Sequence, residues 1–276
     1  MAWGASVDRM RWLWNVLSLK SGYGFVSHLQ PGQRWDAAEF HLTGVRFVDR
    51  MMERVQDYGV KEPSGATLLE IGCGVGRFMQ PFACRFKHVT GIDISRVMLA
   101  RARRYCASLP NITYLLNDGA SIPLPDASVD YCVSAGVLQH ITDAEVILNY
   151  IREALRVLVP GGVFLFQFEG NRTAAVGHNQ TGARISAALL DAGLAQADYR
   201  IREISIDPAD AVRCVVIVLE KCAPGTHAAA AGRSFAQWPM SERRWMSGVY
   251  DDVQTRTQMH ARQQQAPLQL TFYDDP

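Results

Sequence analysis

The fold is decided by one stretch of sequence, Glu70-Ile71-Gly72-Cys73-Gly74-Val75-Gly76. It ends an apolar run typical of a buried strand, residues 67–71, and precedes a helix predicted over 78–86. Glycines at alternate positions let the backbone turn sharply and approach a ligand, because no Cβ stands in the way. In an open α/β sheet, ligands bind at the carboxyl ends of the strands. The stretch therefore predicts a ligand-binding turn inside an α/β domain.

The spacing of these glycines separates two classes of cofactor. A dinucleotide fingerprint is G-x-G-x-x-G, with the pyrophosphate on the following helix N-terminus. Here the third glycine comes one residue early, and Arg77 stands where the dinucleotide motif has glycine. The carboxylate of Glu70 would also lie unfavourably close to a pyrophosphate. The turn therefore argues against a dinucleotide dehydrogenase, which stays open as a rival.

Short apolar strands alternate with amphipathic helices from residue 66 onward. Strands are expected at 67–71, 89–92, 112–116, 129–134 and 163–166. Helices are expected at 78–86, at 95–107 with Ser95 as N-cap, and from a capping box at 142–145 to about 158. Parallel neighbouring strands need helical crossovers, so the alternation predicts a doubly wound, mostly parallel α/β sheet. A helix at 183–192 and two β-rich runs, 199–206 and 212–219, follow.

The two ends of the chain differ from this central region. Residues 1–60 are predicted to form an N-terminal helical cap, with one helix over 10–19 and another starting near Trp35. Residues 61–222 form the expected ligand-binding domain. Residues 223–276 have little periodicity and are expected to be a C-terminal extension, as a tail, a lid or an oligomer contact.

Composition excludes several classes of protein. The 276 residues are 48% hydrophobic and carry 28 basic and 27 acidic side chains, a net charge of +1. Such a balance gives no electrostatic reason to expect a nucleic-acid partner. No apolar run is long enough for a membrane span, and the N-terminus does not read as a secretion signal. Six scattered cysteines without a C-x-x-C motif favour a reducing, cytoplasmic location, and the seven histidines show no metal spacing.

The loop resembles the first motif of the class I S-adenosylmethionine (SAM) dependent methyltransferases, an acidic residue followed by x-G-x-G-x-G. Glu70, Gly72, Gly74 and Gly76 match it in full, and residues 156–162 resemble the family's R-V-L-x-P-G-G turn. The resemblance covers roughly residues 60–221. It implies SAM as cofactor and a seven-stranded sheet with an antiparallel strand in its last hairpin.

The resemblance also assigns cofactor contacts. Asp93 ends the second strand, 21 residues after Gly72, where an acid accepts hydrogen bonds from ribose hydroxyls. By resemblance, Asp118 accepts from the adenine amino group, and Glu70 lies near the methionine ammonium or the loop backbone. The residues expected to bind the cofactor are Glu70, Gly72, Cys73, Gly74, Asp93, Ile94, Asp118, Gly119, Ala120 and Ser134.

The acceptor side is less constrained by the sequence. His140 follows the fourth strand and is expected either to act as a general base or to form part of the pocket wall. The substrate pocket is expected to include Trp35, Phe40, His41, Glu169, Asn171 and His178. For Phe40 a core position is the alternative, and residues 169–179 also fit an ordinary exposed loop.

The sequence predicts methyl transfer to a small molecule or glycan, and a hydroxyl oxygen is the favoured acceptor. The segment after the fourth strand, residues 134–137, lacks the D/N-P-P-Y/F motif of nucleic-acid and glutamine N-methyltransferases. Two alternatives stay open, a small-molecule C- or N-methyltransferase and a non-catalytic SAM-binding subunit. The identity of the acceptor and the oligomeric state, with a homodimer among the options, are also open.

Overall fold

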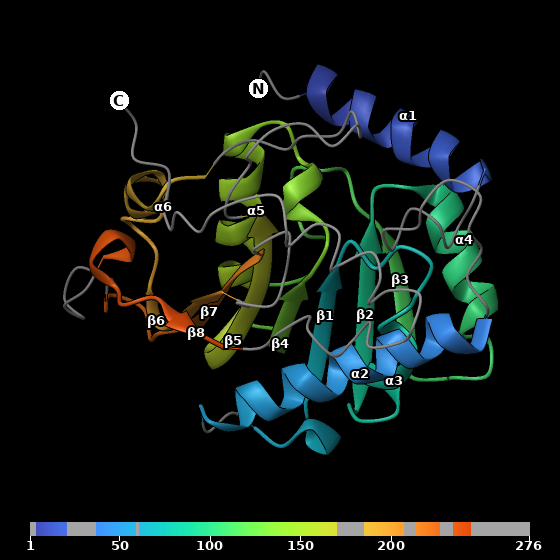
Figure 1. Cartoon of the computed structure of the whole chain (residues 1–276), viewed down its shortest axis with the longest axis horizontal. Coiled ribbons are helices and arrows are strands. Elements are labelled where there is room, and N and C mark those ends of the chain that lie inside the picture. The colour runs from blue at the N-terminus through green and yellow to red at the C-terminus, as the bar shows by residue number, and fades with distance from the viewer. Residues whose placement is uncertain are drawn as a thin grey trace, which may run out of the picture.

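The computed structural model describes residues 4–20, 37–58, 61–169, 185–206, 214–226 and 234–243. Its centre is one sheet of eight strands in the order β3-β2-β1-β4-β5-β7-β6-β8 (Figure 1). The strands are β1 (Thr67–Ile71), β2 (His88–Asp93), β3 (Ile112–Leu116), β4 (Val129–Ser134), β5 (Leu158–Glu169), β6 (Tyr199–Ile206), β7 (Cys214–Lys221) and β8 (Ser241–Glu242). Pairing is parallel except along β7, which runs antiparallel to both β5 and β6.

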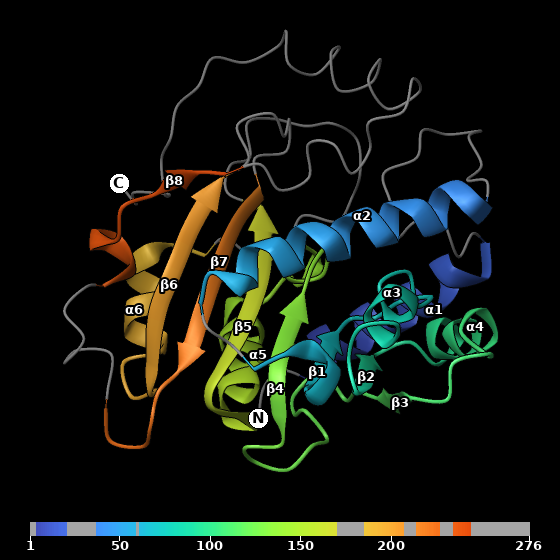
Figure 2. The same cartoon turned by 90° about the horizontal axis from the view of Figure 1, so that it is seen from below.

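Helices cover both faces of this sheet. They are α1 (Gly4–Lys20), α2 (Ala37–Gln56), α3 (Met79–Ala83), α4 (Arg96–Tyr105), α5 (Ala144–Val157) and α6 (Ala187–Gly193). The buried apolar side chains of α5 and α6 share one core cluster with the sheet, and those of α2 and α3 share a second. Figure 2 shows α2 running across one face of the sheet. The predicted doubly wound fold is confirmed.

The last hairpin of the sheet agrees with the predicted antiparallel strand, and one strand was not predicted. The short β8 pairs with the edge of β6 and brings the sheet from seven strands to eight. Nearby, Phe235 is 1% exposed, and its N–H donates to Asp191 Oδ1 of α6 at 2.7 Å. Residues 234–243 of the predicted C-terminal extension thus pack against the sheet domain.

Two helix starts test the predicted capping. Ser95 caps α4 as predicted, because its Oγ accepts from Met98 N at 3.2 Å. At α5 the predicted box with Thr142 as N-cap is wrong by one residue. Asp143 is the N-cap, and its carboxylate accepts from Glu145 N at 2.9 Å. A carboxylate at this position also interacts favourably with the helix dipole.

Helix α1 lies against the carboxyl edge of the sheet rather than over a sheet face. Asn15 Oδ1 accepts from Ser95 Oγ at 2.8 Å, and Arg11 donates to the Asp118 carbonyl at 2.9 Å. A Cβ on Gly119 would lie 2.3 Å from a methyl carbon of Val7, so the loop after β3 fits closely under α1. None of the described helices combines the length and the apolar character that crossing a membrane requires.

Candidate cofactor site

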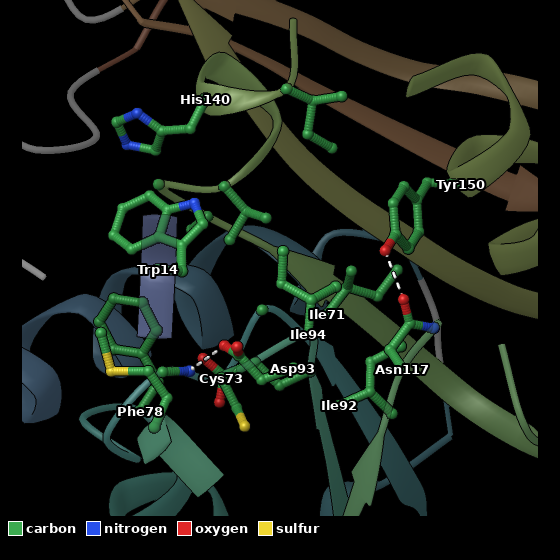
Figure 3. A pocket seen from close by; sticks show the side chains of 18 of the residues that line it. Trp14, Ile71, Cys73, Phe78, Ile92, Asp93, Ile94, Asn117, His140 and Tyr150 are labelled. Carbon is green, nitrogen blue, oxygen red and sulfur yellow. Dashed lines mark hydrogen bonds between the residues drawn. The ribbon is translucent and has the colours of Figure 1, made fainter. Parts of the chain in front are cut away.

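A pocket opens at the carboxyl edge of the sheet, where β1, β2 and β4 end. Figure 3 shows Asp93 near its middle, with Trp14 and His140 on one side and the hydrogen-bonded pair Asn117 and Tyr150 on the other. Most of the lining side chains are apolar. The pocket is lined by Met10, Trp14, Glu70, Ile71, Gly72, Cys73, Gly74, Arg77, Phe78, Ile92, Asp93, Ile94, Met98, Asn117, Ala135, Gly136, Val137, His140, Ile141 and Tyr150.

The glycine loop has a backbone that other residues would strain. Gly72, Gly74 and Gly76 have φ of +74°, +54° and +89°. This left-handed region costs little for glycine only. At Gly72 a Cβ would also lie 2.4 Å from Cγ2 of Val137, so the loop after β4 closes directly over it. The motif is thus required by local geometry.

The amide groups of this loop are used within the protein. Gly72 N and Cys73 N donate to the Ile92 carbonyl at 2.8 and 3.0 Å, and Gly76 N donates to Cys73 O at 2.9 Å. Gly74 N donates to Asp93 Oδ2 at 2.9 Å. Phosphate-binding loops instead point their N–H groups at the anion. These four donors therefore do not form a cradle for a pyrophosphate.

Asp93 joins the glycine loop to the start of α4. Its Oδ1 accepts from Ser95 N at 2.8 Å, while Oδ2 holds Gly74 N. Desolvation in the pocket raises the pKa of this carboxyl to about 6, although hydrogen bonds from Ser95, Gly74 and Ile94 lower it. Each carboxylate oxygen can accept more than one hydrogen bond, so Asp93 can also bind a diol.

Glu70 is a buried carboxyl group at the end of β1. It is 3% exposed, and its Oε2 has no hydrogen-bond partner within the described part of the chain. Burial raises the pKa of Glu70 to about 8; the Arg77 charge lowers this pKa and the Asp93 charge raises it. A buried polar oxygen of this kind needs a partner. A ligand ammonium in the pocket would supply one.

Arg77 brings a positive charge to the pocket that Glu70 also lines. The residue is 5% exposed. Its guanidinium carbon lies 4.4 Å from the centre of the Phe78 ring and 5.8 Å from that of Phe40. Cation–π contact of this kind helps to hold a guanidinium in place.

At the other end of the pocket, Asn117 and Tyr150 form a fixed polar pair. Asn117 Oδ1 accepts from Gly119 N at 2.7 Å and from the Tyr150 hydroxyl. Asp118, the next residue, is exposed, and its carboxylate accepts from Ala120 N and Ser121 N at 2.8 Å each. Asn117 faces the pocket, whereas Asp118 caps its own turn.

His140 ends the short 3₁₀ turn Leu138–His140 after β4. Its ring meets the ring of Trp14 edge-on, with centroids 5.3 Å apart and planes at 71°. Trp14 belongs to α1, so the wall of the pocket around His140 is built by segments far apart in the sequence (Figure 3).

Comparisons with known proteins agree with this geometry. A family described as "Methyltransferase domain" matches residues 69–166. The chain is 41% identical over 114 residues to malonyl-(acyl-carrier protein) O-methyltransferase from Serratia marcescens, covering 41% of this chain and 42% of that protein. It is 34% identical over 143 residues to phosphoethanolamine N-methyltransferase 2 from Caenorhabditis elegans, covering 49% and 32%. The match thus spans less than half the length of these two relatives.

A solved structure repeats the fold. Magnesium protoporphyrin IX methyltransferase from Synechocystis PCC 6803, with bound S-adenosylhomocysteine (SAH), superposes with a TM-score of 0.60 at 15% identity, over 78% of this chain and 99% of that one. Residues 69–166 thus match a methyltransferase domain, and the fold of the chain is that of a class I SAM-dependent methyltransferase. The predicted cofactor is therefore confirmed for the family.

The methyltransferase pocket brings together part of the predicted site. Seven predicted residues line it, namely Glu70, Gly72, Cys73, Gly74, Asp93, Ile94 and His140. Four predicted cofactor residues lie outside its lining, namely Asp118, Gly119, Ala120 and Ser134. Ser134 is fully buried at the end of β4.

Of the predicted substrate residues, the two whose side chains are described, Phe40 and His41, do not line the pocket. Phe40 is 0% exposed and packs with Val75 and Met98 below the loop. His41 Nδ1 lies 3.3 Å from the Tyr105 hydroxyl. Trp35, Asn171 and His178 fall outside the described residues, as does the side chain of Glu169.

Several lining residues of this methyltransferase were missed by sequence reasoning. Met10 and Trp14 looked like one side of an amphipathic helix, with nothing to say what that helix covers. Tyr150 lies within the helix predicted from 142–145 to about 158, and nothing in the sequence marked it as a pocket residue. Asn117 ends the strand run just before the aspartate that the family motif favours. In the described ranges no cluster of three or more His, Cys, Asp and Glu could hold a metal.

Proposed function

We propose that the protein transfers the methyl group of SAM to a hydroxyl oxygen of a small molecule or glycan. The observation that carries the cofactor half of this proposal is the buried Glu70 carboxylate, whose Oε2 is without a partner in the described structure, beside a glycine loop that offers no phosphate cradle. Both features fit a ligand with an ammonium group better than one with a pyrophosphate.

We propose these contacts with the cofactor. Asp93 binds the two ribose hydroxyls, and this contact selects an unphosphorylated ribose. Glu70 binds the methionine ammonium. The apolar side chain of Ile94 packs on the adenine, with Asn117 and Tyr150 at the far end. Asp118 stays a proposed adenine ligand only if its turn rearranges, because its carboxylate is now bonded to backbone N–H groups.

SAM supplies a methyl group on a sulfonium, an electrophile that needs alignment with the acceptor more than activation. The pocket walls formed by Trp14, Val137 and Ile141 would exclude water around the acceptor. His140 would take the proton from the acceptor hydroxyl, because such a hydroxyl ionises far above neutral pH. The proton balance is one hydroxyl proton lost for each methyl ether formed.

A nitrogen acceptor is the second candidate, because one of the relatives is an N-methyltransferase by name. An ammonium group loses a proton to water far more readily than a hydroxyl does, and the neutral amine is already nucleophilic. His140 would then matter little for the rate. Carbon methylation and a non-catalytic SAM-binding subunit are further alternatives. Carbon methylation also releases a proton and would need a base, whereas the subunit predicts no turnover.

The cellular location, the partners and the oligomeric state of the protein are also proposals. A cytoplasmic location is supported by the five cysteines whose side chains are described, since all five are free thiols. A nucleic-acid partner is disfavoured by the net charge of +1. A homodimer is tested directly by size-exclusion chromatography with light scattering.

The first experiment is calorimetry of the full chain with SAH, with NAD as the control ligand. Binding of SAH and not of NAD is expected, and binding of neither SAM nor SAH would overturn the proposal. Label transfer from methyl-labelled SAM is then measured separately into the small-molecule and macromolecule fractions of a cell extract. Label in the small-molecule fraction supports an enzyme of the proposed class, whereas binding without transfer supports the non-catalytic subunit.

The second experiment compares His140→Gln with the wild type. If His140 is the base for a hydroxyl, turnover should fall by about 10²- to 10⁴-fold while the affinity for SAH stays the same. Turnover that His140→Gln leaves unchanged would exclude His140 as the base and favour a nitrogen acceptor.

A further inference from the structure

Arg77 follows the last glycine of the loop, and the function proposed above gives it no role. We infer that the Arg77 guanidinium binds the α-carboxylate of the methionine part of the cofactor, opposite Glu70 and the α-ammonium. The inference rests on the proposed function, because it assumes that SAM occupies the pocket.

The position of Arg77 suits an anion in the pocket. The side chain is 5% exposed and lines the same pocket as Glu70 and Gly74. Its guanidinium lies against the rings of Phe78 and Phe40, at 4.4 and 5.8 Å from their centres. The two rings limit the rotamers of a long side chain, so less freedom is lost when a ligand binds.

Four N–H groups of the glycine loop are already engaged within the protein. The N–H groups of Gly72 and Cys73 donate to Ile92 O, that of Gly74 to Asp93, and that of Gly76 to Cys73 O. A guanidinium beside the loop can supply two further donors to a bound α-carboxylate. Among the described lining residues, Arg77 is the only lysine or arginine.

The charges at this end of the pocket match an amino acid. Glu70 and Arg77 line the same pocket, and the Arg77 charge favours the ionised form of Glu70 by lowering the Glu70 pKa that burial raises. The ammonium and carboxylate of an α-amino acid are separated by one carbon and need two such groups close together. A guanidinium can also bind a carboxylate through two parallel hydrogen bonds.

A purely structural role for Arg77 makes a different prediction. If its contacts with Phe78 and Phe40 serve only to fix the loop, removing them should weaken every adenosine ligand alike. If the guanidinium binds the carboxylate, only ligands that have this group should be affected.

The test is calorimetry with two probes, SAH and its decarboxylated analogue, which lacks only the carboxylate. The wild type should prefer SAH by about 10- to 100-fold, the range for one charge-assisted interaction. Arg77→Met should weaken SAH by about the same factor and leave the analogue within about threefold. Arg104→Met, an exposed arginine of α4, is the matched control and should change neither affinity.

Two other results for Arg77→Met would contradict the inference. An equal loss for both probes in Arg77→Met would assign Arg77 to loop packing, and no loss would remove it from binding. If Arg77→Met does not fold, the wild type decides, because equal affinity for the two probes overturns the inference. Arg77→Lys, which keeps the charge without the planar fork, should lose part of the preference for SAH. A wild type that binds neither probe refutes the proposed function itself, and is thereby distinguished from failure of this inference.

Discussion

Replacing Glu70 by glutamine is expected to stabilise the free protein at neutral pH and to weaken its binding of SAH. The carboxyl has a pKa of about 8 in the folded protein, against 4.5 as the ordinary value. The folded state therefore binds more protons than the unfolded state between these pH values. The stability that the protonated Glu70 carboxyl contributes is complete below pH 4.5 and is lost as the pH rises through 8.

The size of this effect follows from the two pKa values. Ionisation of Glu70 lowers the free energy of unfolding of the wild type by about 3 kcal/mol between pH 4 and pH 7. Well above pH 8 the loss reaches about 5 kcal/mol. Glu70→Gln removes the ionisation, so it should recover up to about 3 kcal/mol at pH 7. The gain is an upper value, because the new amide still has polar atoms to satisfy.

Urea unfolding of both proteins from pH 5 to pH 9, without ligand, measures the difference. The variant should gain stability over the wild type as the pH rises. In thermal unfolding at pH 7, its melting midpoint should lie above that of the wild type by on the order of 5–10 °C. Saturating SAH should reverse the order, because the wild type gains more from the ligand by mass action.

Glu153→Gln is the matched control, because the pKa of Glu153 is shifted in the opposite direction from that of Glu70. A side-chain hydrogen bond from Arg156 lowers the pKa of Glu153, although partial burial raises it. Glu153 therefore contributes stability at neutral pH that is lost as the pH falls, so its variant should be weaker than the wild type at pH 7 and similar at low pH. If Glu70→Gln shows this pattern too, Glu70 is ionised and paired in the free protein, and the reasoning is refuted.

Three further predictions concern other parts of the structure. Asp93→Asn should weaken SAH and 5′-methylthioadenosine by the same factor, about 10- to 100-fold, because both ligands carry the ribose diol; calorimetry that finds a loss for SAH alone would move Asp93 to the amino-acid end. Gly72→Ala should lower the free energy of unfolding by about 2 kcal/mol or more, since φ is +74° and the Cβ would meet Val137. Arg54→Met should cost about 1–3 kcal/mol in urea unfolding, because the buried Glu203 carboxylate loses the Arg54 guanidinium at 3.3 Å but keeps that of Arg243 at 3.1 Å; a cost below about 0.5 kcal/mol would show that Arg243 compensates fully.

The fold was predictable because its signals are local. Strand and helix periods alternate along the chain, and the glycines at 72, 74 and 76 sit at a turn that needs three positive φ angles. The N-cap of α4 was read correctly for the same reason. The cap of α5 was missed by one residue because Thr142 and Asp143 can both cap, and the choice depends on how the preceding turn enters the helix.

The walls of the pocket were less predictable because they depend on tertiary contacts. Trp14 reaches the pocket through the docking of α1, which Asn15 and Arg11 fix to α4 and to the loop after β3. At the end of β3 the outcome turns on one residue. Successive side chains along extended backbone point to opposite sides. Asn117 therefore faces the pocket and Asp118 faces away, and a sequence motif alone does not reveal this alternation.

The charge distribution of the site explains how it selects its ligand. Burial raises the pKa of both Glu70 and Asp93, so the free protein carries a penalty for keeping two carboxyl groups in one pocket. A ligand that presents an ammonium and a diol relieves this penalty, because both groups hydrogen-bond to the ionised form. A pyrophosphate would increase it, since it adds negative charge where the loop N–H groups are already engaged. The features that make the free site unfavourable are therefore the same ones that distinguish an adenosyl amino acid from a dinucleotide.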